Sequence, residues 1–225
     1  MSFKHLFAAK AIAVSSLSVS GAVHGIGWHH GISIGLASEQ SELTLTSNTQ
    51  TLAELDNLSS EFTDNYSIQG YSISPNWAIG YQLDKYETEL TDISSKYQQQ
   101  NLQFDIGMSV FSLDRGLNLY PLIGLRHTSV DILSNDFSST QGYAGFRLDI
   151  PVFQRLFLHA KADTTLTKDK ATYISVAANY RYMRNHSIML QWQQSDLELS
   201  ARDNATDDQL ERNTSQIALR WFLVW

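Results

Sequence analysis

The sequence predicts an all-β fold: a closed antiparallel barrel of ten strands, with eight strands as the alternative. Three features lead to this prediction. Apolar and polar residues alternate with a period of two after residue 25, as they do in half-buried strands. Tight turns alternate along the chain with longer polar connections, and an even number of strands then brings both chain ends to one rim. No apolar stretch reaches the roughly 18 residues that a transmembrane helix needs.

Residues 1–25 have the composition of a secretory signal peptide. Lys4 and Lys10 precede a stretch of apolar and small residues at 11–23, which is too short to span a bilayer. Small residues close to Gly25 suit cleavage. We therefore predict that residues 1–25 are removed and that residues 26–225 form a single barrel domain.

Ten segments of alternating residues are the predicted strands. In chain order they are residues 32–37, 67–73, 77–84, 102–110, 119–126, 144–150, 156–163, 174–182, 188–193 and 217–225. The last segment shows the alternation best, because Ile217, Leu219 and Trp221 share one face while Ala218 and Arg220 share the other. This pattern predicts strands with one apolar and one polar face.

The predicted connections are of two kinds. Four are tight turns, at residues 74–76, 114–116, 153–154 and 183–185. Five are longer and polar, at residues 40–60, 88–97, 133–139, 167–170 and 200–213. Short turns at one rim and longer loops at the other are typical of barrels that cross a bilayer. Pro121 lies inside a predicted strand, and since proline cannot donate a ladder hydrogen bond, we place it at a bulge near the short-turn rim.

The polar face of the predicted strands carries nine charged side chains, whereas the apolar face carries none. The bases are Arg126, Arg147, Lys161, Arg181 and Arg220, and the acids are Asp84, Asp105, Asp149 and Asp163. Charges enclosed in a narrow barrel must pair, because burying one alone is very costly. The near balance of bases and acids therefore favours a barrel lumen filled by a charge network over the alternative, a soluble β-sandwich with a solvated polar face.

Aromatic residues gather at the short-turn end of the apolar face. They are Trp28, Trp77, Tyr180, Tyr182 and Trp225. Amphipathic rings prefer the headgroup level of a bilayer, where membrane barrels carry an aromatic girdle. The sequence therefore predicts that the apolar face contacts lipid and that the short-turn rim is periplasmic.

The C-terminal nine residues, 217–225, resemble the terminal strand of bacterial outer-membrane β-barrels. They combine alternating apolar residues with a final aromatic residue, although Trp225 stands where that family usually has phenylalanine. The size of the chain and its rhythm of turns and loops resemble the small barrels of the OmpA/OmpX type. The resemblance implies an outer-membrane location and recognition by the barrel-assembly machinery. The residues that it marks as the assembly signal are Leu219, Trp221, Leu223 and Trp225.

One pair of residues suggests an enzymatic alternative. His127 and Ser129 lie on the same side of a predicted strand, as a base and a nucleophile would. The pair resembles the His-x-Ser motif of outer-membrane lipid A deacylases, but Val130 replaces the asparagine that follows the motif in that family. We favour the alternative of an ordinary polar cluster at the membrane interface.

The last polar connection carries charges of both signs. Asp207 and Asp208, with a distant histidine, resemble features of the ten-stranded outer-membrane proteases. The acids are also candidates for holding a divalent cation against lipopolysaccharide phosphates, and the bases for meeting those phosphates directly. The residues concerned are Arg202, Asp203, Asp207, Asp208, Glu211 and Arg212. Solvated loop charges are the simpler interpretation.

Together these features predict a non-enzymatic outer-membrane barrel with a packed polar lumen and surface-exposed loops, serving envelope integrity or adhesion. The alternatives are a narrow channel for small solutes and a lipid A-modifying hydrolase. We expect no cofactor and no metal, a monomer, and contacts with outer-membrane lipids and lipopolysaccharide. Nucleic acid is not an expected partner, because the net charge is −7 and basic runs are lacking.

Overall fold

A computed structural model describes residues 29–47, 50–60, 65–74, 76–90, 95–112, 117–132, 135–167, 169–200 and 208–225. The predicted signal peptide and the predicted turn at 114–116 lie outside these residues. Within the described ranges, no helix is long and apolar enough to cross a membrane.

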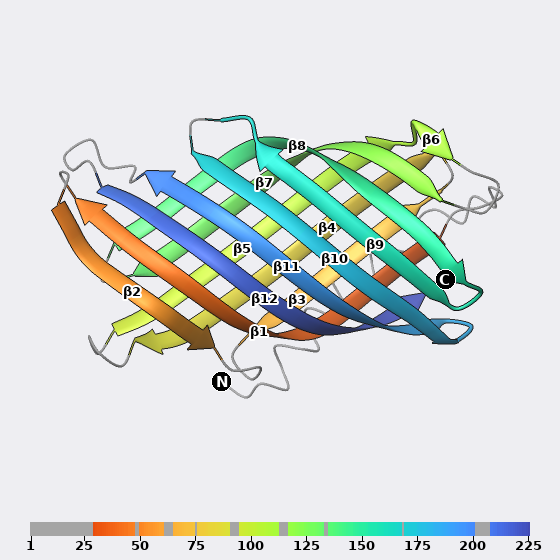
Figure 1. The fold of residues 1–225 in the computed structure, drawn as a ribbon, viewed down its shortest axis with the longest axis horizontal. Coiled ribbons are helices and arrows are strands. Elements are labelled where there is room, and N and C mark those ends of the chain that lie inside the picture. The colour runs from red at the N-terminus through yellow and green to blue at the C-terminus, as the bar shows by residue number, and fades with distance from the viewer. Residues whose placement is uncertain are drawn as a thin grey trace.

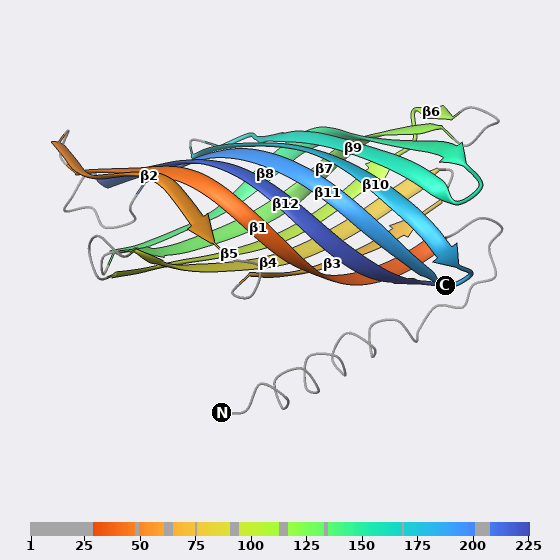
Figure 2. The ribbon, with the colours of Figure 1, turned by 60° about the horizontal axis from the view of Figure 1, so that its bottom comes forward.

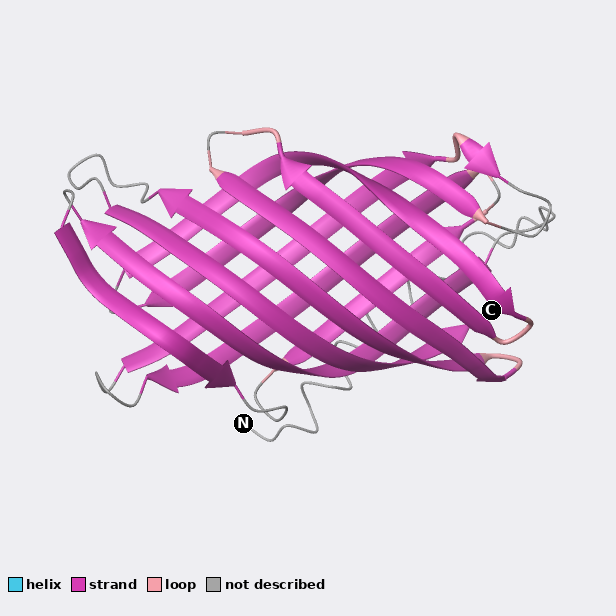
Figure 3. Ribbon diagram, viewed as in Figure 1, coloured by secondary structure: helices cyan, strands magenta, loops and turns pink. Residues whose placement is uncertain are grey.

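The described chain consists of antiparallel strands that close into one barrel (Figures 1 and 3). The strands are β1 (His29–Ser47), β2 (Gln50–Ser60), β3 (Tyr66–Ile73), β4 (Trp77–Leu90), β5 (Ser95–Met108), β6 (Phe111–Ser112), β7 (Asn118–Ile132), β8 (Asn135–Phe153), β9 (Leu156–Thr165), β10 (Lys170–Met183), β11 (His186–Ser200) and β12 (Asp208–Val224). Apart from β2 and β6, successive strands pair in turn, and β12 pairs with β1 to close the sheet. Closure leaves no open edge in the bilayer, where water is absent.

The barrel has ten strand positions, which confirms ten strands over eight. Two of the twelve segments do not add positions. The two-residue β6 pairs only with the start of β7. Strands β2 and β3 occupy one position, because β3 pairs with the first half of β1 and β2 with its second half. Asn65 lies at the break: its side chain donates to the Ala37 carbonyl at 3.5 Å and accepts from the Glu87 amide at 3.1 Å.

Both described chain ends and the short turns lie at one rim, which is therefore the periplasmic rim. The backbones of His30 and Trp225 exchange hydrogen bonds of 3.1 and 3.0 Å there. Residues 154–155 and 184–185 form the turns after β8 and β10. The other ends of the strands form the opposite, extracellular rim, toward the left of Figure 1.

An apolar band, which we call the lipid belt, covers the outer surface nearer the periplasmic rim. Its exposed members include Leu102, Phe104, Ile123, Leu125, Phe146, Ile174, Val176, Leu190, Ile217, Leu219 and Leu223. In β12 the lipid belt runs from Ile217 to Trp225, and at about 3.3 Å per residue and a tilt of roughly 40° this run rises roughly 20 Å. That height is close to the roughly 25 Å apolar band of outer-membrane barrels.

Several strands extend well beyond the lipid belt, which corrects the predicted loop boundaries. Much of 40–60, 88–97, 133–139 and 200–213 is strand: β1 ends at Ser47, β2 fills 50–60, and β12 begins at Asp208. We call this part of the wall the extracellular extension; Figure 2 shows it at the end opposite the C-terminus. Its outward residues are polar because water surrounds it, and this polarity makes the segments resemble loops in the sequence.

The interior of the extracellular extension is apolar. Its packed residues, which we call the extension core, are Leu43, Leu45, Tyr97, Val130, Ile132, Phe137, Ala171, Tyr173, Leu197, Leu199 and Leu210. In β12, buried Leu210 alternates with exposed Gln209 and Glu211. The extracellular extension therefore has the arrangement of a water-soluble β-barrel, apolar inside and polar outside.

Pro121 lies where the pairing between strands is irregular. Gly107 pairs with Leu122, and Phe111 pairs with Leu119. Residues 108–110 thus lie opposite residues 120–121 of β7. One extra residue on one strand is what defines a β-bulge. The missing proline donor falls at this irregularity, close to the periplasmic rim.

Candidate functional site

The lumen is the candidate functional site, and its centre is occupied by Arg126. The guanidinium bonds Asp163 at 2.6 Å and Gln103 at 3.1 Å. It also lies against the rings of Tyr173 and Tyr143, at 3.6 and 4.7 Å from the ring centroids. The Arg126 and Asp163 side chains are each 1% exposed. A cation held by a carboxylate and two aromatic faces is fixed in place.

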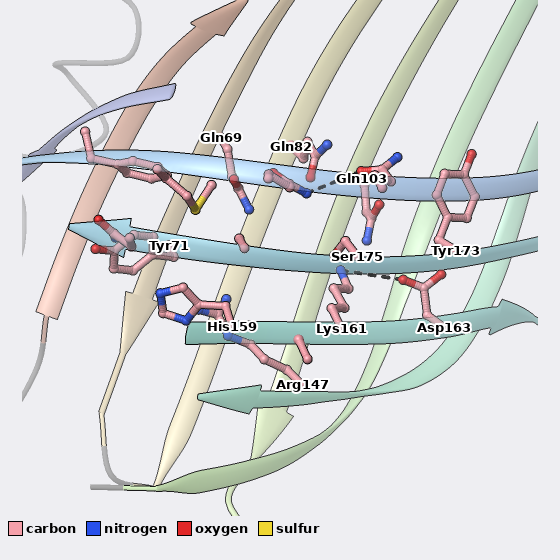
Figure 4. Close-up of a pocket in the computed structure, with 17 residues that line it drawn as sticks. Gln69, Tyr71, Gln82, Gln103, Arg147, His159, Lys161, Asp163, Tyr173 and Ser175 are labelled. Atoms are coloured by element: carbon pink, nitrogen blue, oxygen red, sulfur yellow. Dashed lines mark hydrogen bonds and ion pairs between the residues drawn. The ribbon is translucent and has the colours of Figure 1, made fainter. Parts of the chain in front are cut away.

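Lys161 extends this central cluster. Its ammonium lies 2.6 Å from Asp105 and 3.7 Å from Asp163; Figure 4 shows Lys161 and Asp163 pointing toward one another. The Tyr143 hydroxyl donates to Asp105 at 2.9 Å and accepts from Gln103 at 2.7 Å. Side chains inside the lumen thereby link four consecutive strands of the wall, β5, β7, β8 and β9.

A second group of charges lies toward the periplasmic rim. Asp149 accepts from Arg147 at 2.9 Å and contacts the ring of His159 at 2.8 Å. Arg181 lies 5.5 Å from the ring centroid of Phe157. Among the described residues, no carboxylate pairs with Arg181. This arginine is the surplus base of the predicted five bases and four acids.

A third group connects β12 to β4 through a hydroxyl. Arg220 donates to Ser67, and Ser67 donates to Asp84. Arg220 also donates to Gln191 at 2.9 Å, and Asp84 accepts from Gln82 at 2.6 Å. All nine predicted network residues therefore lie on the lumen side of the wall, but they form three groups rather than a single chain of ion pairs.

Sequence reasoning missed a fourth charge pair, in the extracellular extension. The predicted placement of Arg212 in a solvated loop, where it was a candidate for meeting phosphates, is wrong: its buried side chain pairs with Glu39 inside the barrel. The Arg212 guanidinium also lies 4.7 Å from the ring centroid of Tyr97. Burial lowers the pKa of Arg212 to about 9, which leaves it charged at neutral pH. The alternation of 217–225, continued upstream, places Arg212 on the same face as Arg220 and could have found the pair.

A cavity of about 60 Å³ remains between these groups. Amide side chains from β3, β4, β5 and β11 and the bases of β8 and β9 line it, together with Tyr71, Tyr173 and Phe222 (Figure 4). Several buried polar atoms in the described lumen have no protein partner, including the Asn179 side-chain oxygen and Nε of Arg126. Because buried polar groups are normally hydrogen-bonded, we expect ordered water in this cavity.

Apolar side chains border the polar lumen at both ends. The extension core lies on the extracellular side, and Tyr173 belongs both to it and to the cavity wall. On the periplasmic side, Phe222 and Met189 pack with Ala177, Val224 and Tyr71, and Tyr120 and Leu122 pack with Ala78 and Ile73. The arrangement can hold water and small ions, but side chains fill its ends.

The other candidate residues lie on the outer surface or outside the described ranges. His127 and Ser129 share the outward face of β7, and the His127 ring contacts the Thr140 hydroxyl at 2.9 Å. Glu211 points outward and is exposed. Asp208 begins β12, whereas Arg202, Asp203 and Asp207 lie outside the described residues. Within those ranges, no three His, Cys, Asp or Glu residues gather as metal ligands would.

The predicted assembly-signal residues lie in the closing strand. Leu219, Trp221, Leu223 and Trp225 face outward in the lipid belt. β12 pairs with β1 from Val224 to Asp208 and with β11 along nearly the same length. The Trp225 ring stacks on His30 with centroids 6.2 Å apart. The C-terminal residues therefore complete the cylinder.

Solved bacterial structures are similar to this chain, although no protein-family model and no curated protein sequence matches it. The outer membrane protease OmpT from Escherichia coli has a TM-score of 0.55 and 8% identity, covering 89% of this chain and 97% of that one. The β domain of the Bordetella autotransporter BrkA has a TM-score of 0.45 and 10% identity, covering 86% and 98%. The outer membrane protein OprG from Pseudomonas aeruginosa has a TM-score of 0.44 and 9% identity, covering 90% and 99%.

The similarity to OmpT shows the fold of this chain. At 8% sequence identity it says nothing about activity. The chain has the fold of the bacterial outer-membrane β-barrels. The closed sheet and the lipid belt require a bilayer around the part of the barrel nearer the periplasmic rim, because an exposed apolar band of this extent is unfavourable in water. The protein is therefore a barrel of the bacterial outer membrane.

Proposed function

We propose that this protein is a non-enzymatic outer-membrane barrel with a closed lumen, which supports envelope integrity or adhesion through its extracellular extension. The observation that carries the proposal is the filled interior. Arg126 and its partners occupy the middle of the lumen, and the extension core occupies its outer end. A barrel of about eight to ten strands has an interior that side chains can fill.

Conductance measurements test the closed lumen. Purified protein reconstituted into planar lipid bilayers should give no steady large current, only rare small openings. The pair Leu210→Gly and Leu199→Gly, which thins the extension core, should increase the frequency of openings. A stable, large conductance in the wild-type protein would contradict the closed lumen and would favour the narrow channel.

The surface role rests on the extracellular extension. Its strands are held by paired backbones and by an apolar core, so it presents a firm polar surface beyond the lipid belt. A deletion strain should become more sensitive to large hydrophobic antibiotics if the role is integrity, or lose attachment to host or abiotic surfaces if the role is adhesion. A deletion strain with neither defect would contradict the proposal.

A narrow channel for small solutes is the second candidate. The polar cavity inside the lumen favours it, since amides and charged groups line that cavity. A channel would require the extension core to open, and uptake of small solutes into liposomes that contain the protein would then be measurable. Uptake equal to that of protein-free liposomes would exclude this candidate.

An enzymatic role has weaker support. His127 and Ser129 face outward above Leu125 of the lipid belt, where lipid A would lie, but the His127 ring contacts the Thr140 hydroxyl at 2.9 Å. The E. coli neighbour is a protease, but its similarity to this chain is a similarity of fold and does not extend to activity. Mass spectrometry of lipid A from cells with and without the protein separates these possibilities, and a shortened lipid A found only with the protein would establish a hydrolase.

We propose that the protein acts as a monomer and that its partners are outer-membrane lipids, lipopolysaccharide and, during biogenesis, the barrel-assembly machinery. The lipid belt supports the contact with lipids. The outward aromatic residues at the C-terminal end support recognition by the assembly machinery. Crosslinking from a photoreactive residue at position 223 during assembly should capture the machinery, whereas the same residue at position 211 should not.

A further inference from the structure

The exposed charges at the extracellular end are mostly acidic, whereas those on the described periplasmic turns are basic. At the extracellular end, the exposed acids include Glu42, Asp131, Asp136, Asp196 and Glu211. At the periplasmic rim, Arg155 and Arg184 are exposed, and the described turn residues there include no acidic side chain. An overall acidic chain therefore presents bases to the periplasmic surface of the membrane.

Two neighbouring turns carry these bases. The amide of Arg181 donates to the carbonyl of Arg155 at 2.8 Å, which fixes the turn after β8 against β10. The amide of Val224 donates to the carbonyl of Asn185 at 2.8 Å, which fixes the turn after β10 against the C-terminal strand. The two turns lie one beneath the other beside the C-terminus in Figure 1. Arg155 and Arg184 thus lie along one stretch of the rim.

The same stretch borders the lipid belt. Phe153 is 71% exposed, Met183 60% and Trp225 50%. The rings of Tyr182, His186 and Trp221 stack in sequence, with centroids 6.2 and 5.3 Å apart, and the Trp221 indole donates to the Tyr182 hydroxyl at 3.0 Å. This column holds the turn that bears Arg184 at the border between hydrocarbon and headgroups, where amphipathic rings reside.

We propose that Arg155 and Arg184 bind the phosphate of an anionic phospholipid in the periplasmic leaflet. Exposed arginines beside exposed apolar side chains match a lipid, whose phosphate lies directly above its acyl chains. Arginine suits this role because its planar donors match phosphate oxygens.

Native mass spectrometry of the purified protein tests the proposal. The protein in detergent is mixed with phosphatidylglycerol or with phosphatidylethanolamine of identical acyl chains, and bound lipids are counted. The wild type should retain phosphatidylglycerol preferentially. Arg155→Gln combined with Arg184→Gln should reduce that preference by roughly fivefold for each arginine removed.

The matched control is Lys85→Gln combined with Lys170→Gln, which removes the same charge from the other end of the barrel and should leave the preference unchanged. Heat-dependent migration on gels checks that every variant is folded. Equal binding of both lipids by the wild type, or an unchanged preference in the double arginine variant, would overturn the proposal. Loss of the preference on adding excess inorganic phosphate would also overturn it, because the site would then recognise a free anion.

Discussion

The two halves of the barrel wall use the same strands but place apolar residues on opposite faces. In β12, the outward residues are Ile217 and Leu219 in the lipid belt but Gln209 and Glu211 in the extracellular extension. The inward residues change in the other direction, from Arg220 to Leu210. The surroundings explain the difference: hydrocarbon selects an apolar exterior, whereas water selects an apolar interior.

The comparison also shows where each half obtains its stability. The extracellular extension buries apolar side chains as soluble proteins do. The membrane-spanning half gains little from burying apolar surface against lipid, because lipid chains are themselves apolar. Its lumen is instead fastened by charge pairs such as Arg126 with Asp163 and by the ladder of backbone hydrogen bonds.

The largest expected effect comes from breaking the seam that both halves share. Deletion of residues 223–225, or Trp225→Ala, should reduce insertion because β12 closes the sheet against β1 and an open edge is not tolerated in lipid. Fractionated cells should then contain periplasmic, protease-sensitive protein. Normal outer-membrane levels of the truncated chain would show that these residues are not required for assembly.

The second test addresses the lumen of the membrane-spanning half. Arg126→Ala leaves Asp163 buried and without its closest cation, and losing one partner of a buried pair typically costs about 3–5 kcal/mol. Urea unfolding in phospholipid vesicles should show a clear loss of stability. Lys170→Ala is the control, since its exposed pair with Glu198 should be worth at most about 1 kcal/mol. Equal losses in the two variants would mean that the lumen is solvated.

The third test compares two leucines of β12 that lie in the two halves. Leu210→Ala removes a side chain from the packed extension core and should cost about 2–5 kcal/mol. Leu219→Ala removes one from the lipid belt and should cost less than half as much, because lipid chains fill the space that the leucine leaves. The same unfolding assay measures both, and a larger loss for Leu219→Ala would reverse the assignment of the two halves.

The smallest expected effect concerns charge at the extracellular rim. Asp131 and Asp136 are direct cross-strand partners in β7 and β8. Partial burial and the neighbouring Asp136 carboxylate raise the pKa of Asp131. Because the pKa of Asp131 is raised in the folded state, the folded protein holds the Asp131 proton more tightly than the unfolded chain does. The free energy of unfolding therefore falls as the pH rises through the raised pKa and Asp131 ionises.

Asp136→Asn should therefore stabilise the protein slightly near neutral pH, by less than about 0.5 kcal/mol because the pair is exposed. The gain should vanish below about pH 3.5, where the wild-type carboxyls are protonated. Melting temperatures at the two pH values measure this difference. A gain of equal size at both would show that charge repulsion is not its cause.

Alternation was enough to predict ten strands, the outward face of each strand in the lipid belt, and the side of the wall on which nine charges lie. Period two assigns faces without knowledge of partners. It could not assign strand ends, because beyond the belt the apolar residues change sides and outward polar residues resemble loops. The predicted loop that contained Arg212 is the clearest case: its partner Glu39 is distant in sequence, and only register brings them together.

The sequence by itself determined the barrel, its place in a membrane and its polar interior, because each follows from local alternation and composition. Only the tertiary structure decided which charges meet. Arg126 and Asp163 are 37 residues apart, and Arg220 and Ser67 are 153 apart. Such pairs depend on strand tilt and on the register of every intervening strand. The closed ends of the lumen were likewise decided in three dimensions, since the extension core draws its side chains from β1, β5, β7, β8, β10, β11 and β12.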